Sequence, residues 1–496
     1  MSYVTRTLVL LIVGLFVMTA AASADDRLTV SGNIDFRILF LENYSQNDRH
    51  YTDALIGSPG IPGQRGDEES LSWVHQRYRL IFNIEAFENT KVVAHTFFDK
   101  QWGVATYEIG VGAYGGKMTV EGYWLEGLIP GTAAKFEIGV PYMAAESGGW
   151  GAANKILNTA VPGVTLSTPL SDAINTYTWF AWIGQDVDGY ASSLGGALGG
   201  EPHGDDFAFG SRATISVAEG LEVDLLYAYM LAECGAVQKA NNPNTPCDTG
   251  ALYGAGHNTA YDEDRHWIGS TLRYQYADFS FSPTFIAYVA SDELAGDTES
   301  FLLDVRADYN IGPLSLSGRV VYTPASGINA DGTQRTDQDY DVIGVWGIPL
   351  SVQWFSLYGN SSGTPTFNDL GPLLLGSTPQ GNIRHEGFGL VHVAGKAAYT
   401  LTPQTTLSAA VGIFNTAEDT AGMSRESALA GTTYAGGSNL ATEIDAWLDY
   451  QLYSNTTVSL FVAYAVMGDA LDLVMDGVVY ESQDAMGAGA RIIYTF

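Results

Sequence analysis

Arginines at alternating positions are the residues of this chain that could do chemistry. They lie on the polar side of stretches in which apolar and polar side chains alternate, together with carboxylates: Asp35, Glu85, Asp304 and Asp308. These arginines are Arg37, Arg77, Arg79, Arg212, Arg273, Arg306 and Arg319. Guanidinium groups that line a water-filled pore lower the barrier for an anion. Paired with the carboxylates, they would instead form ion-pair ladders that stiffen a wall, and the sequence favours neither interpretation.

Motifs for catalysis or cofactor binding do not occur. The chain has no nucleotide-binding loop, no zinc-binding His-Glu pair and no haem-attachment motif, and its 8 histidines are scattered. No Ser-His pair stands at strand spacing, as a hydrolase would need. We therefore expect no enzyme, no cofactor and no metal site. The net charge of -32 also argues against a nucleic-acid partner.

The arginines belong to long stretches with a period of two. From Leu28 to Phe40 apolar residues alternate with polar ones, and residues 74–86 repeat the design. Such alternation is typical of a strand with one face in lipid and the other in water, and both stretches are long enough for a barrel wall. The chain ends on the same pattern from Met486 to Phe496, with Arg491 on the polar face.

These stretches predict an all-β fold, a transmembrane antiparallel up-and-down β-barrel of about 18 strands, within a range of about 16 to 20. The weakest strand candidates are residues 161–168 and 340–358. Tight connections such as 218–220 and 312–313 alternate with long ones such as 231–265. This alternation indicates short periplasmic turns and long extracellular loops.

The sequence before Asp25 predicts export. Residues 1–24 carry a basic residue, an apolar run and the small residues Ala22-Ser23-Ala24, which is typical of a signal peptide. Residues 25–496 then form a single barrel domain, in which no apolar run is long enough for a spanning helix. Cys234 and Cys247 flank a polar stretch with two prolines, and in an oxidising compartment they are expected to form a loop disulfide.

Several features together carry a resemblance to a family. The signal peptide, the alternation from Leu28 and the terminal Tyr494 and Phe496 resemble a Gram-negative outer-membrane porin. Four segments carry a finer likeness: Gln76-Arg77-Tyr78-Arg79-Leu80, Tyr123-Trp124-Leu125-Glu126, Ile129-Pro130-Gly131-Thr132 and Phe136-Glu137-Ile138-Gly139. They are similar to segments of the trimeric porins of sulfate-reducing bacteria and of the alginate-export-like barrels.

The resemblance implies a setting and a site. The setting is the outer membrane of a Gram-negative cell, with a homotrimer in contact with lipid and lipopolysaccharide. Tyr494 and Phe496 would form the assembly signal that the barrel-assembly machinery binds. The third external loop of trimeric porins folds inward, and the matching segment here is 143–160, which contains Glu146 and Trp150.

Three hypotheses about function follow. The leading one is an outer-membrane channel for passive diffusion of small hydrophilic solutes or ions through a charged constriction of the lumen. The second is a sheath barrel around a periplasmic partner, such as an electron-conduit cytochrome, with an empty lumen. The third is a structural or adhesive surface barrel with a plugged lumen. The segment 143–160 distinguishes them, because a channel requires it inside the barrel, narrowing the lumen without closing it.

Overall fold

The computed structural model describes a set of stretches of the chain. They are residues 27–42, 70–87, 89–102, 115–146, 155–184, 206–232, 263–292, 296–325, 389–421, 433–475, 478–482 and 484–496. The signal peptide, Trp150, Cys234, Cys247 and the strand candidates within 340–358 lie outside these residues and stay predictions. No helix in the described stretches is long and apolar enough to cross a membrane.

One antiparallel sheet of 18 strands dominates the structure. Its strands are β1 (Leu28–Glu42), β2 (Ser70–Phe87), β3 (Thr90–Trp102), β4 (Gly115–Leu128), β5 (Lys135–Val140), β8 (Gly163–Ser171), β9 (Ile174–Gly184), β10 (Asp206–Ala218), β11 (Leu221–Ala232), β12 (Glu263–Tyr276), β13 (Phe279–Asp292), β14 (Gly296–Ile311), β15 (Leu314–Thr323), β16 (Leu390–Thr402), β17 (Thr405–Asn415), β19 (Asn439–Tyr453), β20 (Thr456–Met467) and β23 (Ala485–Thr495).

Smaller elements accompany the large sheet. β6 (Tyr142–Ala144) pairs with β7 (Asn158–Ala160). A separate three-stranded sheet contains β18 (Thr433–Tyr434), β21 (Leu473–Met475) and β22 (Val478–Tyr480), and the 3-10 helix η3 (Asp469–Leu471) precedes β21.

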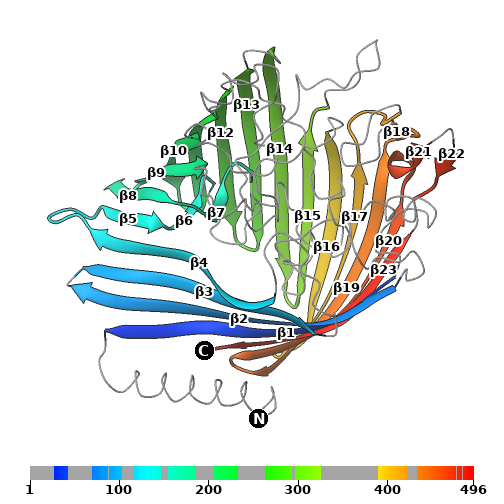
Figure 1. Cartoon of the computed structure of the whole chain (residues 1–496), viewed down its shortest axis with the longest axis horizontal. Coiled ribbons are helices and arrows are strands. Elements are labelled where there is room, and N and C mark those ends of the chain that lie inside the picture. Colours follow the sequence, from blue (N-terminus) through cyan, green and yellow to red (C-terminus); the bar gives the residue numbers. More distant parts are fainter. Residues whose placement is uncertain are drawn as a thin grey trace.

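The large sheet closes on itself. β1 pairs with β2 on one side and with β23 on the other, so the ring of strands has no free edge (Figure 1). At this seam, Gly32 N donates to Phe496 O and Phe496 N donates to Gly32 O, both at 3.0 Å. The predicted antiparallel barrel of about 18 strands is therefore confirmed, and the weak candidate at 161–168 corresponds to β8.

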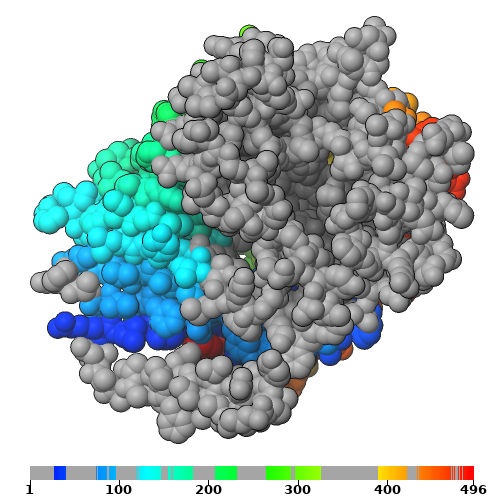
Figure 2. All heavy atoms as spheres, in the orientation of Figure 1, coloured from blue at the N-terminus to red at the C-terminus, as the bar shows by residue number. Residues whose placement is uncertain are grey.

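The period of two separates an outer surface from a lumen surface. On β1, Phe40 is exposed on the outer face, whereas Asp35, of the other parity, is buried on the lumen side. Exposed apolar side chains such as Ile268 and Val462 continue this outer surface round the ring. So large an apolar surface fits lipid rather than water. Figure 2 shows the side chains of β1 to β5 packed closely along one side of the molecule.

Short turns gather at one end of the barrel, the short-turn end. Two residues join β10 to β11 there, and two join β14 to β15. Gly220 and Gly312 in these turns have φ angles of 71° and 58°, which glycine adopts without strain, and a side chain at 220 would collide with Gln275 O. The exposed Tyr276 and Tyr453 lie beside such turns, as in the aromatic girdle of a membrane barrel.

Candidate functional site

The described parts of the connection between β5 and β8 pack against the lumen side of the barrel wall. These parts, residues 142–146 and 155–161, are called the inward segment, and β6 and β7 pair within it. Met143, Ile156 and Leu157 are completely buried in one apolar cluster with lumen-side residues of β9 to β14. The described arms therefore lie where the sequence predicts an inward-folded loop.

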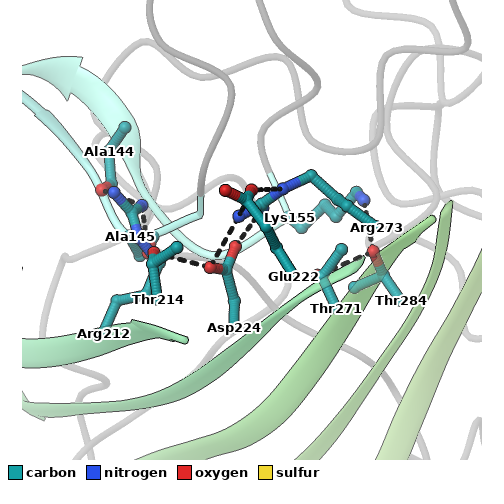
Figure 3. A network of polar contacts seen from close by, with 10 residues as sticks. All are labelled: Ala144, Ala145, Lys155, Arg212, Thr214, Glu222, Asp224, Thr271, Arg273 and Thr284. Carbon is teal, nitrogen blue, oxygen red and sulfur yellow. Dashed lines mark hydrogen bonds and ion pairs between the residues drawn. The ribbon is translucent and has the colours of Figure 1, made fainter. Parts of the chain in front are cut away.

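Arg212 on β10 holds the first arm of the inward segment. Its Nη1 donates to Ala145 O at 3.1 Å and to Ala144 O at 3.5 Å, as Figure 3 shows. The guanidinium carbon lies 5.2 Å from the ring centre of Tyr177 on β9, a cation–π contact that gains strength away from water. Ala145 N also donates to Leu157 O at 2.8 Å, which joins the two arms.

Lys155 holds the second arm. Its Nζ lies 2.9 Å from Asp304 Oδ2 on β14 and donates to Thr284 Oγ1 on β13 at 3.1 Å. Arg319 on β15 donates to both oxygens of the same carboxylate at 2.9 Å. Asp304 and Arg319 are both buried. Two cations therefore converge on one buried carboxylate, and one of them belongs to the inward segment.

A third polar cluster lies between the two anchors. Arg273 on β12 donates to Asp224 through both Nη atoms, with Nη2 at 2.9 Å from Oδ1, and its Nε donates to Glu222 at 3.1 Å. Thr214 on β10 donates to Asp224 at 2.6 Å. Figure 3 shows this cluster beside Arg212 and Lys155, so the inward segment and the charged wall of β10 to β13 form one polar network.

Arg37 on β1 and Arg77 and Arg79 on β2 lie on the opposite wall, because β1 and β12 are nine strands apart in either direction round the ring. Asp35 accepts hydrogen bonds from Arg37 Nε at 3.0 Å and from Arg491 Nε and Nη2 at 2.8 and 2.6 Å. Arg77 stands opposite Asp35 in the register of β2, and Arg79 follows on the same face. Arg37 and Arg77 are buried. For Arg37, this arrangement favours the ion-pair interpretation.

Arg306 is also paired, but in an open place. Its Nε and Nη2 donate to Asp308 at 2.9 and 3.0 Å, and its side chain is partly exposed, whereas that of Arg319 is buried. Glu85, expected as a partner for the arginines, stands opposite Lys91 in the register of β3. The structure thus spreads the predicted arginines round the wall, most of them beside carboxylates, and does not gather them into one cluster.

Glu146 is a buried carboxylate of the inward segment. Its Oε1 has no hydrogen-bond partner among the described residues. Burial raises the pKa of Glu146 to about 7, against the opposing effects of backbone N–H groups and of Lys155. The carboxylate of Glu146 also interacts electrostatically with Arg212. The carboxylate therefore titrates near neutral pH while it lies inside the barrel.

The sequence analysis did not predict some of the charged residues that line the lumen. Arg265 is buried on the lumen side of β12. The alternation through Trp267 and Arg273, extended backwards, includes Arg265. Lys91 and Lys135 were missed because charges beside turns resemble ordinary surface residues. Among the described residues, no three His, Cys, Asp or Glu side chains come together as a metal site requires.

The fold is similar to solved outer-membrane barrels, although no protein-family model and no curated protein sequence matches the chain. The outer membrane protein OprD from Pseudomonas aeruginosa is 12% identical, covers 94% of this chain and 93% of its own, and gives a TM-score of 0.50. OccAB4 from Acinetobacter baumannii is 9% identical, with coverages of 96% and 100% and a TM-score of 0.49. At such identities the likeness to OprD concerns the fold, and the expected likeness to the porins of sulfate-reducing bacteria and to alginate-export-like barrels stays a prediction.

Proposed function

We propose that this chain is an outer-membrane channel through which small hydrophilic solutes or ions diffuse passively. The inward segment carries the proposal: a closed barrel with an apolar outer wall holds a chain segment in its lumen and anchors both arms. A segment fixed in this way narrows a lumen. Pore width, together with the charges that line it, decides what passes.

The packing of the inward segment also bears on the two other hypotheses. A sheath barrel needs an empty lumen, whereas Met143, Ile156 and Leu157 are buried inside the ring. A plugged surface barrel needs its lumen closed, whereas the described arms lie against one wall, β9 to β14. Contact with a single wall supports narrowing rather than closure.

The proposal includes the setting that the sequence implies. The channel would lie in the outer membrane of a Gram-negative cell as a homotrimer, in contact with lipid and lipopolysaccharide. Tyr494 and Phe496 would be the signal for the barrel-assembly machinery. Their rings stack at 5.9 Å and are exposed, which suits recognition before insertion.

Conductance in planar lipid bilayers tests the channel, and an excision tests the inward segment. Val161 N donates to Pro141 O at 3.2 Å, so the two ends of the segment already lie together. A short glycine turn can therefore replace residues 142–160. The parent protein is expected to give stepwise conductance, and the excised variant larger steps.

The two outcomes separate the parts of the proposal. A parent protein that migrates as a folded barrel in an unheated gel but never conducts would overturn the channel. Equal step sizes for parent and excised variant would remove the inward segment from the constriction and leave the channel standing.

A further inference from the structure

Charged side chains of the lumen fall into two groups by exposure. The side chains of Arg37 and Arg319 are 1% and 3% exposed, and both are hydrogen-bonded to buried carboxylates. The side chains of Lys91, Lys135 and Arg306 are 38%, 39% and 38% exposed. A passing solute can meet the second group, together with exposed carboxylates such as Glu85 and Glu222.

Lys91 and Lys135 belong to a row of ion pairs near the short-turn end. Glu126 on β4 lies between them, 3.1 Å from Lys91 Nζ on β3 and 3.0 Å from Lys135 Nζ on β5. Glu137 lies 2.9 Å from Lys135 Nζ and accepts a hydrogen bond from Thr165 at 2.9 Å. The side chains of this row point to the lumen, since the apolar residues that alternate with them along each strand face outward.

In this row the cations reach further into water than the carboxylates. The side chains of Glu126 and Glu137 are 19% and 16% exposed, about half the exposure of the two lysines. Each pair is therefore oriented with its positive end toward the lumen. A permeating ion feels that end first, because the carboxylates are more deeply covered by protein.

Arg306 repeats this arrangement on the opposite wall. Its partner Asp308 is 26% exposed, again less than the cation. β3 and β14 are nine strands apart in either direction round the ring, so Lys91 and Arg306 project from opposite sides. They lie two and six positions from Asn89 and Gly312, which are turn residues of the same end. Partly exposed cations therefore project from opposite walls, Lys91 close to the short-turn end and Arg306 deeper in the barrel, opposite Arg319 in the register of β15.

One pair on the wall between them has the reverse polarity. Glu222 is 45% exposed, whereas its partner Arg273 is 30% exposed. In this pair the carboxylate is more exposed to the lumen than the cation. This pair offers a control of opposite sign at the same end of the barrel.

We infer that Lys91, Lys135 and Arg306 are the specificity-determining residues of the channel and give it a preference for small anions. The inference rests on the proposed function and deepens it: the inward segment limits size, and the partly exposed cations of the lumen wall select by charge. Exposed charges act over about 10 Å at an ionic strength of 0.1 M, so cations on opposite walls influence the ions that enter between them.

Reversal potentials across a bilayer, measured in a tenfold KCl gradient, test the inference. The double variant Lys91→Gln plus Lys135→Gln is expected to lower the chloride-to-potassium permeability ratio at least twofold. Arg306→Gln is expected to lower the ratio by less, since it removes one cation. Glu222→Gln, the matched control, is expected to raise it. The double variant Arg77→Ala plus Arg79→Ala is expected to change the ratio least.

Each outcome decides one point. If the lysine variant conducts and keeps the parent ratio, the inference is wrong and the proposed function stands. A larger change from the Arg77 and Arg79 variant than from the lysine variant would move selection to the wall of β2 and also overturn the inference. If the folded parent protein does not conduct, the proposed function itself fails.

Discussion

Two sets of ion pairs on the lumen wall share one chemistry and differ in their contact with water. Around Asp35 and Asp304, carboxylates are buried and each accepts hydrogen bonds from two cations. Around Glu126 and Asp308, the cations are exposed. Loss of one partner from a buried pair lowers the unfolding free energy strongly. Loss of an exposed pair lowers it little, but the charges of such a pair can act on solutes. The same residue types thus stabilise the wall in one place and, by our inference, select ions in the other.

The substitution Asp304→Asn is expected to have the largest effect. It leaves Arg319 and Lys155 in a buried place without their shared carboxylate, at a cost of about 3–5 kcal/mol in unfolding free energy. Urea unfolding of the barrel in lipid vesicles measures this loss. Asp308→Asn is the control, with an expected loss below about 1 kcal/mol because that pair is exposed to water. Equal losses for both variants would break the comparison.

The next effect is a pH dependence at Glu146. Its pKa is about 7 in the anchored inward segment and near 4.5 when the segment is released into water. Since the pKa is raised in the anchored state, anchoring is strongest below about pH 4.5 and weakens as the pH rises through 7. At about 1.4 kcal/mol per pH unit, the total change is about 3 kcal/mol.

Channel conductance between pH 5 and pH 8 measures this titration. The parent protein is expected to show larger or noisier conductance as the pH rises. Glu146→Gln keeps the shape of the side chain and cannot ionise, so its conductance should stay constant over that range. A pH response that survives in the glutamine variant would assign the titration to another group.

The substitution Arg212→Met tests the first anchor. It removes two hydrogen bonds to backbone carbonyls and the contact with Tyr177, and should destabilise the anchored arm by about 1–3 kcal/mol. Single-channel recordings are expected to show more current noise. Arg306→Met removes an arginine that is paired with Asp308, and should leave the noise at the parent level. Equal noise in all three proteins would mean that Arg212 does not anchor the arm.

The smallest effect concerns salt. Raising KCl from about 0.1 M to about 1 M shortens the screening length from about 10 Å to about 3 Å, so the ion preference set by the partly exposed cations should decline. The unfolding free energy should change by less than about 1 kcal/mol, since the buried pairs are shielded from salt by protein. A preference that is equally strong at both concentrations would place the selecting charges in a buried part of the lumen.

Sequence reasoning reached the fold because the period of two is a local signal. Each strand reveals its two faces through its own residues, as Leu28 to Phe40 do, and the strand count followed from counting such stretches. The partners of the arginines were less accessible. Arg37 finds Asp35 two residues away, but Arg319 meets Asp304 from a neighbouring strand and Lys155 from the inward segment.

Exposure was the part that the sequence could not supply. Arg306 and Arg319 both stand on the polar parity of long strands, and nothing in their neighbouring residues separates them. The difference arises because the inward segment brings Lys155 to the carboxylate that Arg319 binds, while Arg306 stays open to the lumen. The exposure of each arginine therefore depends on how the inward segment packs, and Lys155 of that segment is more than a hundred residues away in the chain.

The seam between β1 and β23 sets the order in which the barrel can be made. Arg491 and Asp35 are 456 positions apart in the chain, yet they share hydrogen bonds across it. Contacts between hairpin neighbours need only short loops to close, whereas this contact must wait for the ends of the wall to meet. Until then the growing sheet has two unpaired margins that invite association with other chains. Closure of the ring is therefore the step that removes the unpaired strand edges and with them the tendency of the open intermediate to aggregate.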